Sequence, residues 1–258
     1  MEALFDISRG LIVVGLTMLL AMLRLDAERF GTAEYYEPTG ERERQRPRLR
    51  RRLGWYALGA GIVVAMLYIH PAPQRELFLG SGDRLGAIVG GLAFGALGVA
   101  QAVAFATIRY HRIRFPETWS YPGALLNSTA TAFLDEVTFR GAIFGTLLLL
   151  GIEATLANVI QTLLYALATR LGAPGRDRYL LATTLGIGFI GGWLTAATGG
   201  IAAAFLGHAI ARFAIFLCTG HTGQTLPRGR EVEEIEKRRR PPDGWRVIGS
   251  RESTTRDR

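Results

Sequence analysis

The stretch FLDEVTFRG, residues 133–141, places two carboxylates and one guanidinium in a segment made mostly of Ala, Leu, Phe, Ile and Gly. Glu136 and Arg140 are four residues apart, so on a helix they share a face and can pair. Asp135 lies about 100° around the helix from Glu136, so we expect that one arginine does not neutralise both acids. Ionisable groups near the centre of a membrane helix cost about 2.5–3.5 kcal/mol each, and they are retained where they face protein or a water-filled cavity.

Other polar side chains that could serve the same site lie in later apolar segments. His208 stands in AFLGHAIARF, and Arg212 follows it by one helical turn. Tyr165 and Thr169 end a segment that also carries Asn158, Gln161 and Thr162. A carboxylate facing an imidazole can activate a water molecule for hydrolysis, share a divalent metal such as zinc, or relay protons in a transporter. The residues alone leave these three alternatives open.

Long apolar runs and blocks of charge divide the chain. The runs at 10–23, 85–106 and 180–197 contain no charged residue, and long apolar runs of this kind indicate membrane-spanning helices. The first run is the shortest and resembles a signal peptide in length, but Glu2 and Asp6 precede it and no small-residue cleavage site follows. We therefore expect an uncleaved first helix in an all-α, polytopic membrane bundle.

The apolar pattern predicts seven transmembrane helices. Their expected ranges are 7–25, 53–70, 85–108, 124–150, 153–170, 179–197 and 199–218.

The basic residues predict the orientation of this bundle. The segments 24–52, 109–120, 170–178 and 218–258 carry 25 Lys and Arg residues, and the opposite side carries three. Basic residues concentrate on the cytoplasmic side, so we expect the N-terminus outside, the C-terminus in the cytoplasm, and a multi-pass protein of the plasma (inner) membrane. The excess of Arg over Lys favours a bacterial source.

Two regions follow from this pattern, a helical transmembrane domain at 1–218 and a basic cytoplasmic tail at 219–258. The tail mixes acidic and basic residues, and we expect it to be disordered. The net charge of +8 is explained by membrane topology and by contact with anionic lipid, so we expect no nucleic-acid partner. The single cysteine excludes an intrachain disulfide and a cysteine-cluster metal site.

The order and spacing of the polar residues resemble the CPBP family, the CAAX-protease and bacteriocin-processing membrane proteins. DEVTFRG at 135–141 is similar to the family motif Glu-Glu-x-x-x-Arg, and TTLGIGFIGGWLTAATGGIAAAFLGHAIARF at 183–213 is similar to its Gly-rich helix pair ending in His. The resemblance covers about 120–218. It implies an intramembrane endopeptidase with Asp135, Glu136, Arg140 and His208 at the catalytic positions and Tyr165, Thr169 and Arg212 lining the site.

The chain departs from the family pattern at three of these positions. Asp135 is one methylene shorter than the family's leading Glu, Thr169 stands where the second motif has His, and Arg212 replaces an Asn. His70, His111 and His221 fall at expected helix ends or loops and do not compensate. We expect the site residues to line one cavity open to the cytoplasm.

Three functions remain open at this stage. The first is an endopeptidase that acts on membrane-associated peptides through an Asp or Glu and a His, with the lipid bilayer and a peptide or membrane-protein substrate as partners. The alternatives are a non-catalytic relative that binds a membrane partner and a small proton-coupled transporter. No organic cofactor is expected, and the resemblance leaves a zinc-dependent mechanism open.

Overall fold

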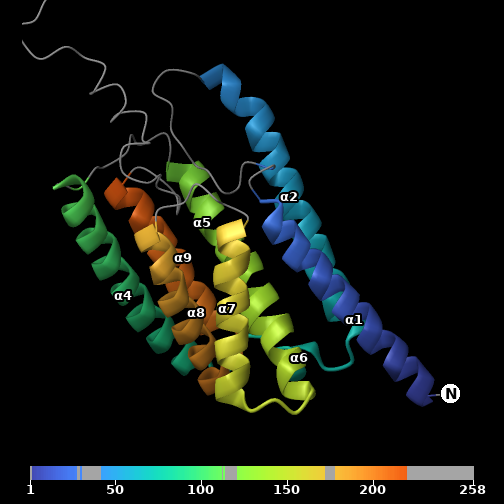
Figure 1. The fold of residues 1–258 in the computed structure, drawn as a ribbon. Coiled ribbons are helices and arrows are strands. Elements are labelled where there is room, and N and C mark those ends of the chain that lie inside the picture. Colours follow the sequence, from blue (N-terminus) through green and yellow to red (C-terminus); the bar gives the residue numbers. More distant parts are fainter. Residues whose placement is uncertain are drawn as a thin grey trace, which may run out of the picture.

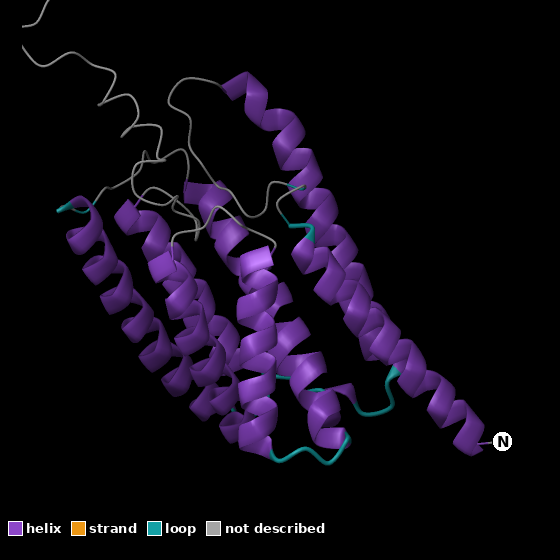
Figure 2. Ribbon diagram, viewed as in Figure 1, coloured by secondary structure: helices purple, strands orange, loops and turns teal. Residues whose placement is uncertain are grey.

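The structure, a computed structural model, describes residues 2–27, 30, 42–111, 113, 121–171 and 178–219. These residues form helices and connecting loops and contain no strand (Figure 2). The elements are α1 (Glu2–Leu25), α2 (Arg42–Ile69), the short α3 (Pro73–Glu76), α4 (Arg84–Tyr110), α5 (Tyr121–Asp135), the π-helical segment η2 (Glu136–Ile143), α6 (Phe144–Leu149), α7 (Ala154–Leu171), α8 (Arg178–Thr198) and α9 (Ala202–Thr219).

The long helices alternate in direction along the bundle. α1, α4, α7 and α9 end at the same side of the molecule, where α2, α5 and α8 begin (Figure 1). The helix ends on this side are the ones that flank the Arg-rich segments of the sequence. The opposite end carries the connection through α3, the turn between α6 and α7, and the turn between α8 and α9 (Figure 1).

Five of the described helices are long and apolar enough to cross a membrane. They are Ser8–Leu25, Arg50–Ile69, Arg84–Tyr110, Arg178–Thr198 and Ala202–Thr219. The two other predicted spans coincide with helical structure, the continuous run from α5 through η2 to α6 and helix α7. Both carry many polar side chains, and these are buried, among them Asn127, Asp135, Gln161 and Thr169. The polar side chains of these two helical runs thus face the bundle interior.

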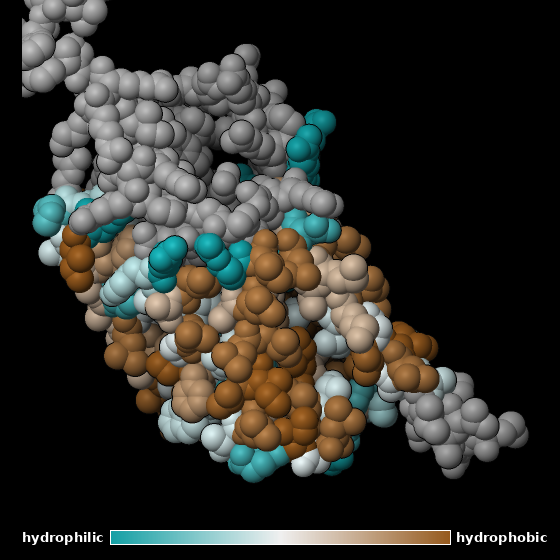
Figure 3. Space-filling model, in the orientation of Figure 1, coloured by the Kyte–Doolittle hydropathy of each residue, from teal (hydrophilic) through white to brown (hydrophobic). Residues whose placement is uncertain are grey.

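An apolar belt surrounds the described helices. Large apolar side chains are exposed along it, including Met18, Leu85, Leu163 and Trp193. The space-filling view shows this brown surface between more hydrophilic residues at the ends of the helices (Figure 3). Such an arrangement leaves apolar groups outside and polar groups inside, as expected where lipid replaces water as the solvent.

Helices α1 and α2 pack together and against the segment that carries the buried acids. Leu20 and Leu23 of α1 share a core with Trp55 of α2 and Val137 of η2. The Trp55 indole Nε1 donates a hydrogen bond to the Leu23 carbonyl at 2.9 Å. The C-terminal end of α1 is thereby held close to the start of η2.

Small residues bring α4 and α9 into close contact. A Cβ on Gly91 would meet the Leu206 side chain at 2.9 Å, and one on Gly98 would overlap Ala211. Helices pack this closely in membranes because lipid gives little drive for association and contact between backbones supplies it. The contact fixes one face of α9 against α4, while His208 and Arg212 of α9 remain buried in the bundle.

Two boundary predictions require correction. We expected the second helix to begin at residue 53, but α2 begins at Arg42, so the Arg-rich stretch 42–52 extends the helix. Arg24 was counted among the loop charges, yet it lies in the last turn of α1 and is 4% exposed. Apart from Thr219, the predicted tail lies outside the described residues.

Candidate active site

The acids lie where the long α5–α6 run changes from α-helix to π-helix. Asp135 ends α5 and Glu136 begins η2. The Thr138 hydroxyl donates to the Leu134 carbonyl at 2.7 Å, a side-chain bond that competes with the regular backbone pattern and loosens a helix. Single-turn π-helical segments are frequent at functional sites. The sequence predicted a regular helix here, and this local geometry is a correction to it.

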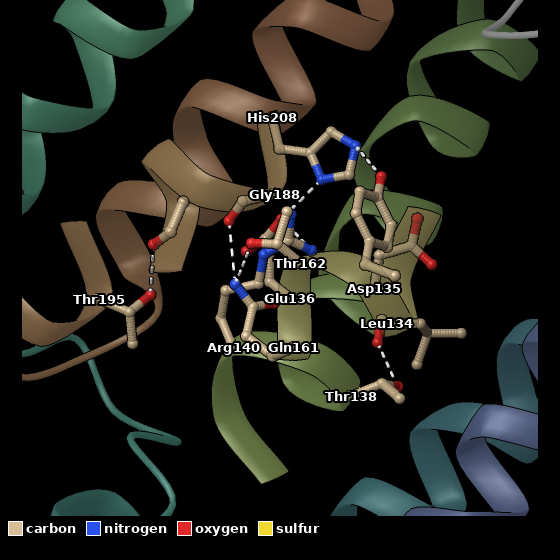
Figure 4. Close-up of polar contacts among 12 residues, drawn as sticks. Leu134, Asp135, Glu136, Thr138, Arg140, Gln161, Thr162, Gly188, Thr195 and His208 are labelled. Carbon is tan, nitrogen blue, oxygen red and sulfur yellow. Dashed lines mark hydrogen bonds and ion pairs between the residues drawn. The ribbon is translucent and has the colours of Figure 1, made fainter. Parts of the chain in front are cut away.

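Glu136 lies against His208 in the centre of the bundle. The His208 Nδ1 atom is 2.7 Å from Glu136 Oε1 (Figure 4), and both side chains are buried. Because a carboxylate only accepts hydrogen bonds, His208 carries its proton on Nδ1 in this contact. Its Nε2 atom then faces the Tyr165 hydroxyl at 3.3 Å. The three side chains form a carboxylate–imidazole–phenol chain across η2, α9 and α7.

Arg140 closes this cluster from the next turn of η2. Its Nη1 atom is 3.3 Å from Glu136 Oε1, which confirms the predicted pairing of these two residues. Its guanidinium carbon lies 4.1 Å from the centre of the Tyr165 ring. A cation over an aromatic face contributes up to about 2 kcal/mol when it is desolvated. Tyr165 therefore contacts both the imidazole and the guanidinium of the site.

Asp135 points to a different neighbour. Its Oδ1 atom lies 2.7 Å from Arg24 Nε of α1, and both side chains are buried. The expectation that one arginine does not serve both acids agrees with this arrangement: Arg140 pairs with Glu136, and Arg24 pairs with Asp135. His208 contacts Glu136 directly, whereas Asp135 interacts with it only electrostatically.

Arg212 belongs to a third buried contact beside the site. Its Nη2 atom donates to Asn127 Oδ1 at 3.2 Å, and Asn127 Nδ2 donates to the Tyr56 hydroxyl at 3.0 Å. The guanidinium also lies close enough to Asp135 and Tyr165 to interact electrostatically. These contacts join α2, α5 and α9 one helical turn from His208.

Thr169 does not enter the contacts described above. It is fully buried, and its hydroxyl oxygen has no hydrogen-bond partner within the described part of the chain. Two other polar residues of α7 bond to α8 instead: Asn158 Nδ2 donates to the Phe189 carbonyl at 3.1 Å, and Gln161 Nε2 donates to the Gly188 carbonyl at 3.0 Å. Tyr165 is thus the residue of this segment that reaches the acid–imidazole cluster.

Helix α8 contributes glycine backbone to the wall of the site. A Cβ on Gly191 would lie 3.2 Å from Arg140 Nε and 3.5 Å from Glu136 Oε2. A Cβ on Gly192 would overlap Asn158 Oδ1. The Gly-rich sequence of α8 thereby lets the buried polar groups of η2 and α7 approach its backbone.

The donor set does not fit a zinc site. Zinc sites commonly use three or four His, Cys, Asp or Glu ligands, and the described residues contain no group of three such side chains placed to hold a metal. Asp135 is paired with Arg24, and Glu136 shares one oxygen between His208 and Arg140. Each acid already has a cationic or hydrogen-bonding neighbour from the protein.

Sequence reasoning missed Arg24, Asn127 and Tyr56. Arg24 could have been identified from the sequence. It ends an apolar run, and Asp135 and Glu136 together need more positive charge than Arg140 alone supplies. Asn127 could also have been identified, as an amide inside an apolar segment. Tyr56 could not, since a tyrosine near a helix end commonly lies at a membrane interface.

The comparisons with known proteins agree with the resemblance seen in the motifs. No curated protein and no solved structure matches the chain. Residues 117–214, less than half of the chain, match a family model described as "Type II CAAX prenyl endopeptidase Rce1-like". This segment holds Asp135 and Glu136, Tyr165, His208 and Arg212, and it is similar to the Rce1-like type II CAAX prenyl endopeptidases.

Proposed function

We propose that this protein is an intramembrane endopeptidase that hydrolyses membrane-anchored peptides with Glu136 as the general base. The observation that carries the proposal is the 2.7 Å contact between His208 Nδ1 and Glu136 Oε1 in a buried cluster. The family match of residues 117–214 supports protease-like chemistry. Asp135, Thr169 and Arg212 differ from the residues of the family motifs, so their functions cannot be carried over from the family.

In the proposed reaction, the second oxygen of Glu136 activates the water. Oε1 is held by His208 and Arg140, whereas Oε2 has no hydrogen-bond partner among the described residues. A water on Oε2 gives its proton to the carboxylate as its oxygen attacks the peptide carbonyl carbon. The tetrahedral intermediate then loses the C–N bond, and Glu136 returns the proton to the leaving amine.

His208 and Tyr165 keep the base in position. The Nδ1–H group of His208 donates to Glu136, and the Tyr165 hydroxyl donates to Nε2, so this tautomer is fixed at both nitrogens. A shift of about 1 Å at a reacting group can cost about 10²-fold in rate. Loss of the contacts that orient Glu136 should therefore lower the cleavage rate measurably.

Arg212 stabilises the oxyanion in this proposal. A guanidinium has five N–H donors, and Arg212 uses one nitrogen, Nη2, for Asn127. Its Nε has no hydrogen-bond partner within the described residues. Donors aimed at the developing negative charge are worth about 10²–10³ in rate, and Arg212 supplies one where the family has an Asn.

We also propose the membrane topology that the arginines predicted. The α5–η2–α6 run and α7 add two spans to the five apolar helices, with the N-terminus outside, the C-terminus in the cytoplasm and the plasma membrane as the location. The alternating helix directions support this arrangement (Figure 1). Cysteine labelling with a membrane-impermeant reagent at residues 81 and 230 tests it, since the two positions should react from opposite sides.

Cleavage by purified protein tests the proposed reaction. Wild-type protein in nanodiscs is incubated with a library of membrane-anchored peptides, and the products are read by mass spectrometry. We expect cleavage by the wild type, its loss in His208→Ala, and no effect of a chelator. No cleavage above the His208→Ala background, from protein shown to be folded, would overturn the proposal.

Thr169 favours a second candidate function. It stands at the second-motif histidine position of the family, and a hydroxyl cannot replace an imidazole as a base. A non-catalytic relative would keep the buried cluster for structure and bind a membrane protein or peptide without cutting it. In the same assay it would retain peptides on the nanodiscs without forming products.

A further inference from the structure

The structure points to a role for Arg24 that rests on the proposed function: we infer that Arg24 is a positioning residue that holds Asp135 in an ion pair and leaves Glu136 as the acid available for chemistry. Arg24 lies on α1, outside the matched segment 117–214. The candidate active site would then include the first helix of the chain.

Arg24 is buried on the core-facing side of α1. Its side chain is 5% exposed, as buried as that of Leu23 in the apolar core, whereas Met22 and Leu25 are exposed. An arginine in the last turn of a helix is favoured by the helix dipole, but a dipole contact needs no burial. The buried guanidinium of Arg24 instead contacts Asp135, with Nε 2.7 Å from Oδ1.

The end of α1 is fixed in the position that this contact needs. Trp55 is buried, and its indole donates to the carbonyl of Leu23, the residue before Arg24. Leu20 and Leu23 pack in the same core as Leu134, the residue before Asp135. Both members of the ion pair therefore follow directly after residues of one apolar core.

Among the described residues, Arg24 is the one partner of the Asp135 carboxylate at hydrogen-bonding distance. Apart from the Arg24 contact, neither of its carboxylate oxygens has a hydrogen-bond partner within the described part of the chain. Arg140 is committed to Glu136 and Tyr165, and Arg212 donates to Asn127. Arg24 is thus the direct counter-ion of Asp135.

The two adjacent acids consequently take different roles. Asp135 is held by Arg24 of α1, and Glu136 faces His208, as Figure 4 shows. The residue at the family's leading-acid position becomes a docking point for the first helix, and general base chemistry moves one residue along the chain. Asp is one methylene shorter than the Glu of the family motif. The shorter side chain is compatible with binding Arg24, because a carboxylate with that structural role does not have to reach a substrate.

A thermodynamic cycle on full-length protein tests the pair without requiring activity. The variants are Arg24→Met, Asp135→Asn and the double variant, with Arg75→Met at an exposed arginine as the control. Removing one partner of a buried pair leaves an uncompensated charge, so each single change should lower the unfolding temperature by on the order of 10 °C. The double variant should lose no more than one single variant, and the control should lose at most about 2 °C. Additive losses in the double variant would overturn the pairing.

Cleavage kinetics test the positioning role. In Arg24→Met, kcat should fall by about 10–100-fold with KM within about twofold, and Arg24→Lys should recover at least part of the loss. The double variant should retain measurable cleavage, whereas Glu136→Gln should lose about 10²–10⁴-fold. Wild-type-like kcat in Arg24→Met, or a double variant as inactive as Glu136→Gln, would overturn the inference while leaving proteolysis intact.

A wild type that cuts nothing would overturn the proposed function and the catalytic part of this inference together. The unfolding cycle would still decide whether the ion pair between Arg24 and Asp135 exists.

Discussion

His208 Nδ1 lies 2.7 Å from Glu136 Oε1, although 72 residues separate them in the chain. The contact joins the π-helical turn of the α5–α6 run to the middle of α9. It places an imidazole against one acid of the Asp135–Glu136 pair, and Arg24 of α1 takes the other acid. The two adjacent carboxylates thus have different partners, one on α9 and one on α1.

Two variants of Tyr165 should distinguish the effect of its hydroxyl contact with His208 from the effect of its ring packing against Arg140. Tyr165→Phe removes the hydroxyl that faces His208 Nε2 and keeps the ring beneath Arg140. We expect kcat to fall by about 10-fold or more, because the imidazole loses one of its two contacts, with an unfolding temperature within about 2–4 °C of the wild type. Tyr165→Leu should also lower the unfolding temperature clearly, because it removes the cation–π contact. Equal kinetics in Tyr165→Phe and wild type would contradict the orienting role.

Glycines on α8 offer a matched test of how the site wall is packed. A Cβ on Gly192 would overlap Asn158 Oδ1, whereas a Cβ on Gly186, in the same helix, meets nothing within 4 Å. Overpacking costs about 1–3 kcal/mol, so Gly192→Ala should lower the unfolding temperature by several degrees. Gly186→Ala should leave it unchanged or slightly raised. Thermal unfolding in detergent gives both values, and equal shifts would mean that α7 and α8 are less closely packed than the structure has them.

His70 should make stability depend on pH at the end of the bundle opposite the Arg-rich segments. It follows α2, and partial burial lowers the pKa of its imidazole below the ordinary 6.5, an effect that the Glu76 carboxylate 3.6 Å away opposes without reversing. The Ala72 amide also donates to His70 Nδ1, which favours the neutral ring. The unfolded chain then binds the proton more readily, so stability is complete above about pH 6.5 and falls as the pH drops below it.

A His70→Gln variant measures this effect. Its unfolding temperature should change less between pH 8 and pH 5 than that of the wild type, by a few degrees at most. If the pair with Glu76 dominated instead, acid would stabilise the wild type relative to the variant, and the sign assigned here would be wrong.

The helices of this protein were predictable because hydropathy reports on lipid contact directly. Each predicted span coincides with a helix or helical run in the structure. The α5–α6 run and α7 carry polar residues such as Asn127 and Gln161, and these are buried inside the bundle. Hydropathy averages over a helix and does not register which face a polar residue occupies.

The site was predictable as a set of residues but only in part as a geometry. The four-residue spacing predicted the Glu136–Arg140 pair, which the structure confirms. Spacing along one helix carries no information about partners on other helices. The sequence therefore did not predict that Arg24 pairs with Asp135 or that Asn127 pairs with Arg212. The sequence also did not predict the π-helical turn, because its apolar and polar pattern is that of a regular helix.

The most direct test of the central claim is the single-turnover cleavage rate of Glu136→Gln against the wild type, in nanodiscs, on one peptide that the wild type cuts. Gln keeps the shape of the side chain and an oxygen for His208 but cannot take a proton from water. We expect the rate to fall by about 10²–10⁴-fold while the folded protein still binds the peptide. A Glu136→Gln rate within about threefold of the wild type would contradict the claim that Glu136 is the general base.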